Sequence, residues 1–229
     1  EPYALAIANT LTNVVCNGQD DGTIGITVSG GVTTYTYAWT QSGGGSGVVA
    51  AAEDQTGLSP GTYNVTVTDA NSCTVTAEYT ITEPAAALAI TETIPQYNGF
   101  QISCNDANDG AIDVTVTGGT SGYTYAWTTV GGSGLVAAAE DQTGLGPGTY
   151  NVTVTDANSC TITDTYTITE PTALSVSAIP SSFNGFNITC NGVNDGAIDV
   201  TASGGVLVAP AVYTYAWTTV GGSGLVAAA

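Results

Sequence analysis

The sequence contains no lysine, arginine or histidine, while its 19 aspartate and glutamate residues give a formal net charge of −19. The chain therefore has no histidine or lysine that could act as a general base or form a Schiff base. It has no basic patch to neutralise phosphates, so the charge excludes nucleic-acid binding. An anionic membrane surface would repel the same charge.

Methionine is also absent, and no apolar run reaches the ~18 to 20 residues that a membrane-spanning helix needs. We therefore expect no membrane insertion. We interpret the sequence as a piece of a longer mature chain, because it shows neither a translation start nor a signal peptide. Hydrophobic residues make up 43% of the sequence, which is enough for a folded core. The abundant Thr, Val, Gly and Tyr are typical of strands and turns.

Two segments of the sequence recur without change. GTYNVTVTDANSCT occupies 61–74 and again 148–161, and YTYAWTTVGGSGLVAAA occupies 123–139 and again 213–229. Corresponding cysteines are 86 to 88 residues apart, which predicts a tandem array with a repeat of about 87 residues. We expect three modules, over residues 1–84, 85–171 and 172–229, of which the third stops before its end.

Each complete module contains two cysteines, which are 57 residues apart in the first module and 56 in the second. We expect one disulfide within each module, joining Cys16 to Cys73 and Cys104 to Cys160. We interpret Cys190 as unpaired because its module is cut short, with a free thiol or an intermolecular bridge as the alternative. Each bridge would contribute about 4 kcal/mol in the chain-entropy model and would imply an oxidising, extracellular compartment.

Within a module, runs of alternating apolar and polar residues are separated by Gly, Asn and Asp clusters, and helical periodicity is missing. This pattern predicts an all-β, immunoglobulin-like sandwich of seven short strands. Tyr63 and Tyr150 follow a Pro-Gly turn, where such a sandwich has its tyrosine corner. In the second module we expect the strands near residues 88–90, 101–104, 111–117, 123–128, 142–145, 149–155 and 161–168.

In this strand order the first cysteine of a module ends the second strand and the second cysteine opens the seventh, so both would lie at one pole of the sandwich. Acidic loops lie at the same pole, where a calcium ion could stiffen the joint with the preceding module. Calcium prefers carboxylate and amide oxygens, although Asx turns explain the same residues without a metal. The candidate calcium ligands are Asp20, Asp21, Asp69, Asp106, Asp109, Asp156 and Asp195.

Tyr123, Tyr125 and Trp127 alternate along one expected strand and therefore share a face. Such a row either fills the core or forms a stacking platform for sugars, in which Tyr125 and Trp127 would make the contact. The acidic pair Glu140-Asp141 does not fit a glycosidase site, because neighbouring residues on a strand point to opposite faces. The sequence therefore predicts no catalytic residues.

Several short motifs follow one another in the second module. They are C-N-x-x-x-D-G-x-I at 104–112, G-G at 118–119, Y-T-Y-x-W at 123–127, L-x-P-G-x-Y-x-V-x-V-x-D-A-x-x-C at 145–160 and E-P at 170–171. In this order they resemble the SprB-type repeat. The resemblance implies a large repetitive surface protein of Bacteroidetes-type bacteria, whose best-known members are gliding-motility adhesins exported by the type IX secretion route. It implies no catalytic residues.

Together these features predict a structural stalk or filament of a bacterial cell-surface adhesin, which projects from the cell or forms an extracellular fibre. The expected partners are neighbouring modules of the same chain, other copies in a fibre, and surface glycans. A polysaccharide-binding surface module and the spacer of a secreted enzyme are the alternatives. No cofactor other than calcium is expected.

Overall fold

The computed structural model describes residues 3–207 and 212–221, and every regular element in this part of the chain is a β-strand. None of these residues forms a helix that is long and apolar enough to cross a membrane. Contacts between Cα atoms divide the chain into two units, and the boundary between them passes through the strands of the second repeat. The first unit is Glu1–Thr91, Thr115–Ala126 and Thr153–Asp164, and the second is Glu92–Val114, Trp127–Val152 and Thr165–Ala229.

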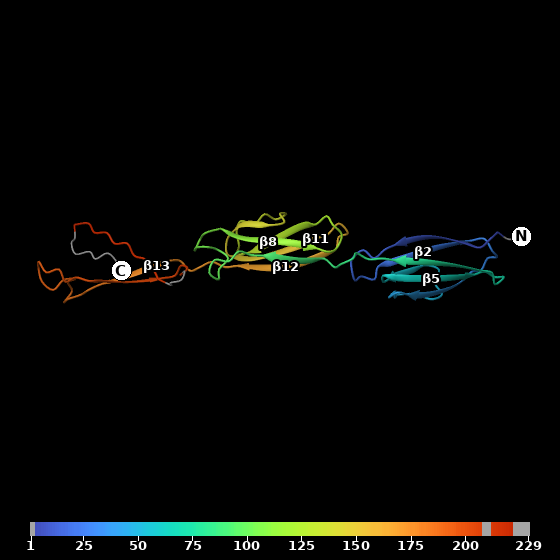
Figure 1. Ribbon diagram of the computed structural model, residues 1–229, viewed down its shortest axis with the longest axis horizontal. Helices are drawn as coiled ribbons and strands as arrows, with labels where there is room; N and C mark the ends of the chain where they lie inside the picture. The colour runs from blue at the N-terminus through green and yellow to red at the C-terminus, as the bar shows by residue number, and fades with distance from the viewer. Residues whose placement is uncertain (1–2, 208–211, 222–229) are drawn as a thin grey trace. The chain divides into compact units, whose positions relative to one another are not determined.

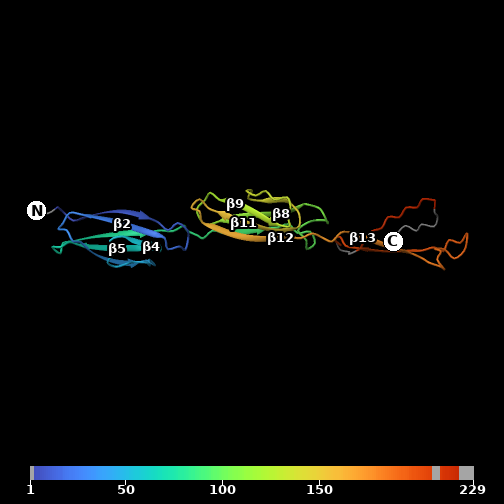
Figure 2. The ribbon, with the colours of Figure 1, turned by 180° about the vertical axis from the view of Figure 1, so that it is seen from behind.

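The first repeat is a sandwich of two antiparallel three-stranded sheets, with strand orders β1-β2-β4 and β3-β5-β6. This is the arrangement of strands A, B, E and C, F, G in immunoglobulin-like sandwiches. Figures 1 and 2 show β2 and β5 in separate layers. The strands are β1 (Ala6–Thr12), β2 (Gly22–Ser29), β3 (Thr36–Ser42), β4 (Gln55–Leu58), β5 (Gly61–Thr68) and β6 (Thr74–Ile81).

The core of the first repeat lies between these two sheets. In β5, Tyr63, Val65 and Val67 are buried and alternate with half-buried polar residues, as expected for a strand with one face toward the core. They pack in one cluster with Trp39 of β3 and Ile24 of β2. Burial of each such side chain contributes about 1.5–3 kcal/mol, so this alternation holds the two sheets together.

The expected tyrosine corner is present in both complete repeats. The Tyr63 hydroxyl donates to the carbonyl oxygen of Ser59 at 2.6 Å, and the Tyr150 hydroxyl donates to that of Gly146 at 2.7 Å. Each partner lies four residues before its tyrosine, and each tyrosine is fully buried. The corner therefore fixes the turn that leads into the fifth strand of the repeat.

The second repeat has the same two sheets, with strand orders β10-β8-β7 and β12-β11-β9. Each of β10, β11 and β12 begins 87 residues after its counterpart β4, β5 or β6. The strands are β7 (Ala89–Thr93), β8 (Gly110–Thr117), β9 (Thr124–Val130), β10 (Gln142–Leu145), β11 (Gly148–Thr155) and β12 (Thr161–Ile168).

Within the described residues, each complete repeat has six strands instead of the seven that were expected. Residues 101–104, expected to form the second strand, are a loop. Ile102 is buried like a strand residue, but the amides of Gln101 and Ile102 both donate to the single carbonyl oxygen of Thr169. Two amides that share one acceptor do not form a ladder, so the apolar residue anchors a loop rather than a strand.

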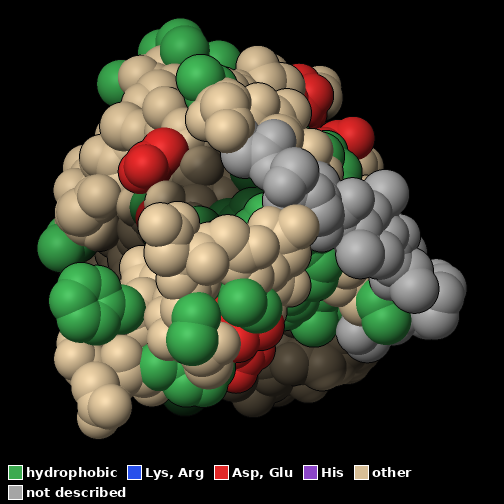
Figure 3. Space-filling view, turned by 90° about the vertical axis from the view of Figure 1, so that its left-hand side faces the viewer, with side chains coloured by type: hydrophobic (Ala, Val, Ile, Leu, Met, Phe, Trp, Pro, Cys, Tyr) green, Lys and Arg blue, Asp and Glu red, His purple; other side chains and the backbone are tan. Residues whose placement is uncertain are grey.

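In the third repeat, β13 (Ser175–Pro180) and β14 (Ile198–Ser203) form one antiparallel pair within the described residues. Val176, Ile179 and Phe186 are 67%, 71% and 72% exposed. A single pair of strands has no second layer to pack against, which explains this exposure. On the face drawn in Figure 3, hydrophobic side chains lie among acidic ones, and no basic side chain is visible.

The loops of the first repeat lie at two opposite poles. At the N-terminal pole, Gly31 donates to Tyr3 and Ala70 donates to Val32, which brings together the start of the repeat, the β2–β3 loop and the β5–β6 loop. At the C-terminal pole, Val14 of the β1–β2 loop donates to the carbonyl oxygen of Thr82, where β6 ends. Loops that are adjacent in the sequence thus face opposite ends of the module.

Candidate functional site

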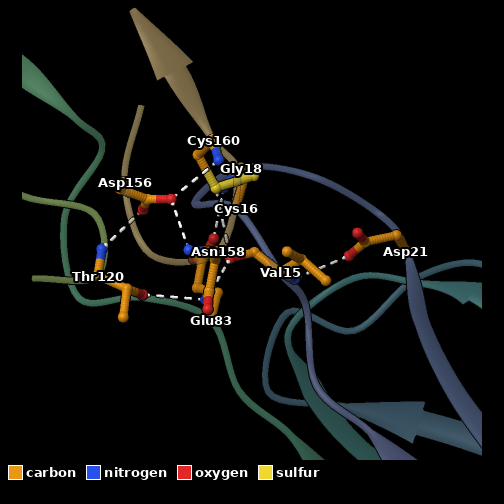
Figure 4. The surroundings of a disulfide bond; sticks show 9 residues. All are labelled: Val15, Cys16, Gly18, Asp21, Glu83, Thr120, Asp156, Asn158 and Cys160. Carbon is orange, nitrogen blue, oxygen red and sulfur yellow. Dashed lines mark hydrogen bonds between the residues drawn. A yellow bond between two sulfur atoms is a disulfide. The ribbon is translucent and has the colours of Figure 1, made fainter. Parts of the chain in front are cut away.

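A disulfide joins the first repeat to the second. Cys16 and Cys160 are bonded, with their Cα atoms 5.8 Å apart and a sequence separation of 144 residues. Cys16 lies in the β1–β2 loop at the C-terminal pole of the first repeat, and Cys160 lies in the β11–β12 loop of the second (Figure 4). Both cysteines belong to the first of the two units. We refer to residues 15–18, 83–84, 120 and 156–160 as the joint.

This connectivity corrects the pairing that was expected within modules. Cys73 and Cys104, the predicted partners of Cys16 and Cys160, are free thiols. Within the first repeat, Cys16 lies at the C-terminal pole and Cys73 at the N-terminal pole, separated by the length of an eight-residue strand, about 25 Å at ~3.3 Å per residue. A disulfide requires Cα atoms about 4.4–6.8 Å apart, so the two cysteines of one module cannot meet.

Hydrogen bonds on both sides of Cys16 hold the loop that carries it. The Val15 amide donates to Asp21 Oδ1 at 3.0 Å, and the Gly18 amide donates to Glu83 Oε2 at 2.6 Å. Asn17 Nδ2 donates to the carbonyl oxygen of Pro84 at 2.8 Å. Gly18 has a φ of +79°, in the left-handed region that glycine adopts without a steric penalty. The Glu83-Pro84 linker is thus tied to the loop that bears the first cysteine.

The loop that carries Cys160 is organised by one carboxylate. Asp156 Oδ1 accepts hydrogen bonds from the amides of Asn158 at 2.9 Å and Cys160 at 2.8 Å, and Oδ2 accepts one from the Thr120 amide at 2.8 Å. These bonds favour the ionised form and lower the pKa of Asp156, the bond from Thr120 most strongly. The carboxylate therefore fixes the β11–β12 loop in the shape that presents Cys160.

Non-covalent contacts cross the joint beside the disulfide (Figure 4). Asn158 Nδ2 donates to the carbonyl oxygen of Val15 at 3.2 Å and to Thr120 Oγ1 at 3.0 Å. Cys160 Sγ lies 3.6 Å from the same Val15 oxygen, in van der Waals contact, because a disulfide sulfur carries no proton to donate. Asn158 thus connects the first repeat with two loops of the second, a role that its position in an ordinary turn sequence did not reveal.

Five of the seven aspartates considered as calcium ligands, all except Asp20 and Asp106, accept hydrogen bonds from backbone amides. Asp69 repeats the bonds of Asp156, and Asp21, Asp109 and Asp195 each accept a bond from the amide six residues before. Bonds from backbone amides, that of Val32 most strongly, lower the pKa of Asp69. Bonds from the side chain and the amide of Ser103 lower the pKa of Asp109, and the same bonds from Thr189 lower the pKa of Asp195. Across residues 3–207 and 212–221, no three acidic or cysteine side chains gather into a group that could hold a metal ion. Calcium binding stays a prediction, which melting curves with and without a chelator would test.

The aromatic row contributes to the core. Trp127 is 3% exposed, its Nε1 donates to the carbonyl oxygen of Ala139 at 2.9 Å, and its ring lies 6.0 Å from that of Tyr166. A buried indole cannot stack on a sugar, so the platform prediction is wrong for Trp127 and core packing is correct. Tyr125 is half-buried beside it. In the first repeat, burial and then a hydrogen bond with Glu53 raise the pKa of Tyr37 to about 12.

Two buried glutamines were not recognised from the sequence. Gln55 is 1% exposed, its Oε1 accepts from the Val49 amide at 2.8 Å, and its Nε2 donates to the Val49 carbonyl oxygen at 3.0 Å. Gln142 makes the same pair of bonds with Val136. In the sequence, the only sign that these glutamines hold a loop is that each directly follows a Glu-Asp pair. The aspartate of the first pair also holds the backbone, because Asp54 Oδ1 accepts a hydrogen bond from the Ile26 amide at 2.9 Å.

These observations define a class of protein: a tandem array of immunoglobulin-like β-sandwich modules in which a disulfide crosses the joint between consecutive modules. Three segments, residues 8–44, 101–132 and 186–222, match the family model of the SprB repeat. These matches agree with the SprB-type resemblance that the sequence motifs had indicated.

Among solved structures, the chain is similar to the C-terminal 282-residue fragment of intimin, in complex with the intimin-binding domain of the translocated intimin receptor. It is 20% identical to this chain, with a TM-score of 0.37, and the alignment covers 79% of this chain and 67% of the intimin chain. No curated protein matches the sequence significantly.

Proposed function

We propose that this chain is part of the stalk of a large bacterial cell-surface adhesin, in which SprB repeats carry tension between the cell and a distant binding end. SprB repeats indicate an adhesin-type surface region and a structural rather than an enzymatic role. The observation that supports a load-bearing stalk is the Cys16–Cys160 disulfide, because it connects consecutive repeats by a covalent bond.

The disulfide changes the path that a pulling force takes along the chain. Force applied at the two ends passes from Cys16 directly to Cys160, so the residues between them are not stretched. Those residues include β2–β6 of the first repeat and β7–β11 of the second. At ~3.3–3.6 Å per residue, the separation of 144 residues corresponds to about 500 Å of chain that tension cannot extract while the disulfide is intact.

The charge of the chain suits a long exposed stalk. A net charge of −19 with no basic residue gives every repeat a negative surface. Like charges keep neighbouring stalks apart and soluble, and they replace the edge lysines that often protect exposed strands from pairing. The partners that this surface admits are cations, water and the neighbouring repeats of the same chain.

Single-molecule pulling on the 229-residue chain tests this proposal. We expect the fully stretched length of the oxidised chain to be about 500 Å shorter than that of the chain reduced with a thiol reagent, because the disulfide keeps the residues between Cys16 and Cys160 from being stretched. Cys16→Ser should behave like the reduced chain under both conditions, whereas Cys73→Ser, which removes a free thiol, should behave like the unmodified chain. Equal extension of the oxidised and reduced chains would contradict a load path through the joint.

A second experiment tests the location. An antibody raised against the chain should label intact cells of the bacterium that produces the full-length protein, and protease treatment of those cells should remove the label. The protease must cut at apolar or acidic residues, because the chain offers no lysine or arginine to trypsin. Labelling only after the cells are broken would contradict a surface stalk.

A further inference from the structure

We propose that the disulfide of the joint belongs to a series, in which the first cysteine of each repeat bonds with the second cysteine of the repeat that follows. Cys104 would then bond with the second cysteine of the third repeat. Cys73 would bond with the first cysteine of a repeat that precedes the first. The partner in each case is a cysteine thiol on another copy of the same module. The inference concerns covalent connectivity and does not depend on the stalk function.

The loop around Cys104 is built like the loop around Cys16. The Ser103 amide donates to Asp109 Oδ1 at 3.1 Å, as the amide before Cys16 does to its aspartate at 3.0 Å. The Asp106 amide donates to Glu170 Oε2 at 2.7 Å, as the amide two residues after Cys16 does to the linker glutamate at 2.6 Å. The first cysteine of the second repeat is therefore held in the bonding loop conformation although it is a free thiol.

Cys104 also faces the same surface of the next repeat as Cys16 does. At the first joint, the residues that line one hollow include Cys16 and Asn17 of the first repeat and Ala87, Leu88, Gly119, Ser159 and Cys160 of the second. Between the second and third repeats, a hollow is lined by the equivalent residues Cys104, Asn105, Ala173, Leu174 and Gly205. The thiol of Cys104 thus lies at the surface of the third repeat that corresponds to the one against which Cys160 is bonded.

The other half of the bond is preformed around Cys73. Asp69 Oδ1 accepts from the amides of Asn71 at 2.9 Å and Cys73 at 2.8 Å, and Oδ2 accepts from the Val32 amide at 2.9 Å. The loop around Cys160 has the same three bonds, made by its own aspartate. Both the bonded and the free second cysteine are therefore presented by one conserved geometry within this chain, and Cys73 is exposed.

Bond formation requires an oxidant, for which we name a low-molecular-weight disulfide. The Cys104 thiolate attacks one sulfur of that disulfide, forms a mixed disulfide and releases one thiolate. The thiolate of the second cysteine then attacks Cys104 Sγ and releases the other. Two protein thiols lose two electrons and two protons, and the oxidant's disulfide is reduced to two thiols.

A chain extended through the third repeat tests the inference. The 229 residues would be followed by a copy of residues 140–169, since the sequence of 123–139 recurs at 213–229 and 140 is the next position. The extended chain would be oxidised with glutathione disulfide and digested with a glutamate-specific protease. Cleavage after the glutamates at 53, 78, 92 and 140 places Cys16, Cys73 and Cys104 in separate peptides. Cys160 and Cys190 share one peptide, because the protease does not cut the Glu170-Pro171 bond, and alkylation of that peptide reports whether Cys190 is a thiol. The added peptide ends at the copy of residue 169, so its mass differs from that of its native counterpart.

We expect the peptide of Cys104 to be linked to the added cysteine, while Cys190 stays a thiol. The Cys16–Cys160 link in the same digest shows that the joint has folded. In a matched Cys104→Ser variant the added cysteine should be recovered as a thiol. A link between Cys190 and the added cysteine, or an unlinked added cysteine in a chain that contains the first bond, would overturn the inference. If only this second link failed to form, the series would be disproved, whereas the pulling experiment on the Cys16–Cys160 disulfide would still test the stalk separately.

Discussion

Glu83 accepts a hydrogen bond from the Gly18 amide at 2.6 Å, and in this way the linker after the first repeat is fastened to the loop that carries Cys16. The same bond recurs 87 residues later, where Glu170 accepts from Asp106 at 2.7 Å. The glutamate of the E-P linker is therefore not only a spacer residue. It positions the linker beside the cysteine that is bonded to the following repeat.

Replacement of Glu83 should weaken formation of the Cys16–Cys160 disulfide. In Glu83→Ala we expect the equilibrium constant for this bond, measured in a glutathione redox buffer, to fall about two- to tenfold, which is the effect of losing an exposed hydrogen bond of ~0.5–1.4 kcal/mol. Glu83→Gln keeps an acceptor oxygen and should restore most of the loss. Glu92→Ala removes an equal charge from an exposed position on β7 and serves as the control. A similar decrease in Glu92→Ala would show that net charge, not the bond to Gly18, controls the joint.

Removal of the disulfide should destabilise the first two repeats together. A cross-link over 144 residues contributes about 5 kcal/mol in the chain-entropy model, so Cys16→Ser should lower the free energy of unfolding by up to that amount. Denaturant unfolding followed by tryptophan fluorescence measures the change. Cys73→Ser is the matched control, because it replaces a free thiol and should change the stability by less than ~0.5 kcal/mol. Equal losses in the two variants would be inconsistent with this role of the disulfide.

Much of the module could be predicted from the sequence, because strands and turns leave local signals. The alternation in β11 around Val152 and Val154 corresponds to one buried face, and the Pro-Gly turn before Tyr150 indicated the tyrosine corner. Burial of Trp127 was one of two readings that the alternation allowed, since period-two spacing places residues on a face but does not say whether that face is covered. Only the packing of the second sheet decided it.

The joint could not be predicted, because each strand carries the chain from one pole of the module to the other. One strand too many therefore places every earlier loop at the wrong pole. The alternation of polar and apolar residues over 101–104 is typical of a strand, and Ile102 is indeed buried like a strand residue, although the segment is a loop. Counting it as a strand moved Cys104 to the pole that carries Cys160. Without it, the two cysteines of a module lie at opposite poles, and the partner must come from the neighbouring repeat. No local pattern in the sequence separates a strand from a loop anchored by one buried side chain.

Loss of the tyrosine-corner hydroxyl should destabilise its own repeat. The Tyr150 hydroxyl lies 2.7 Å from the Gly146 carbonyl oxygen and accepts a bond from the Ser133 amide at 3.0 Å. Tyr150→Phe leaves these backbone groups without a partner, so we expect the free energy of unfolding to fall by about 1–3 kcal/mol. Tyr97→Phe, at a residue that is 39% exposed, provides the control in the same denaturant titration. A loss of equal size in Tyr97→Phe would show that the corner has no special contribution.

The carboxylate of Asp156 should make the stability of the joint dependent on pH in the acidic range. Hydrogen bonds from the amides of Thr120, Cys160 and Asn158 lower the pKa of Asp156 in the folded chain below the ~3.9 of an unfolded aspartate. The unfolded chain therefore takes up the proton first as the pH falls. The stabilisation is complete above the unfolded pKa and is lost as the pH falls through the folded pKa.

The comparison that isolates this effect is the difference in unfolding free energy between the unmodified chain and Asp156→Asn, measured from pH 7 to pH 2. Because all other carboxylates are shared, the relief of their mutual repulsion by acid cancels in the difference. We expect the unmodified chain to be more stable at pH 7 and its advantage to shrink below about pH 4, near the unfolded aspartate pKa. Asp113→Asn, at an exposed carboxylate of β8, should show a much smaller dependence on pH. A difference for Asp156→Asn that stays constant down to pH 2 would mean that the ionised carboxylate is not what holds the Cys160 loop in its bonding shape.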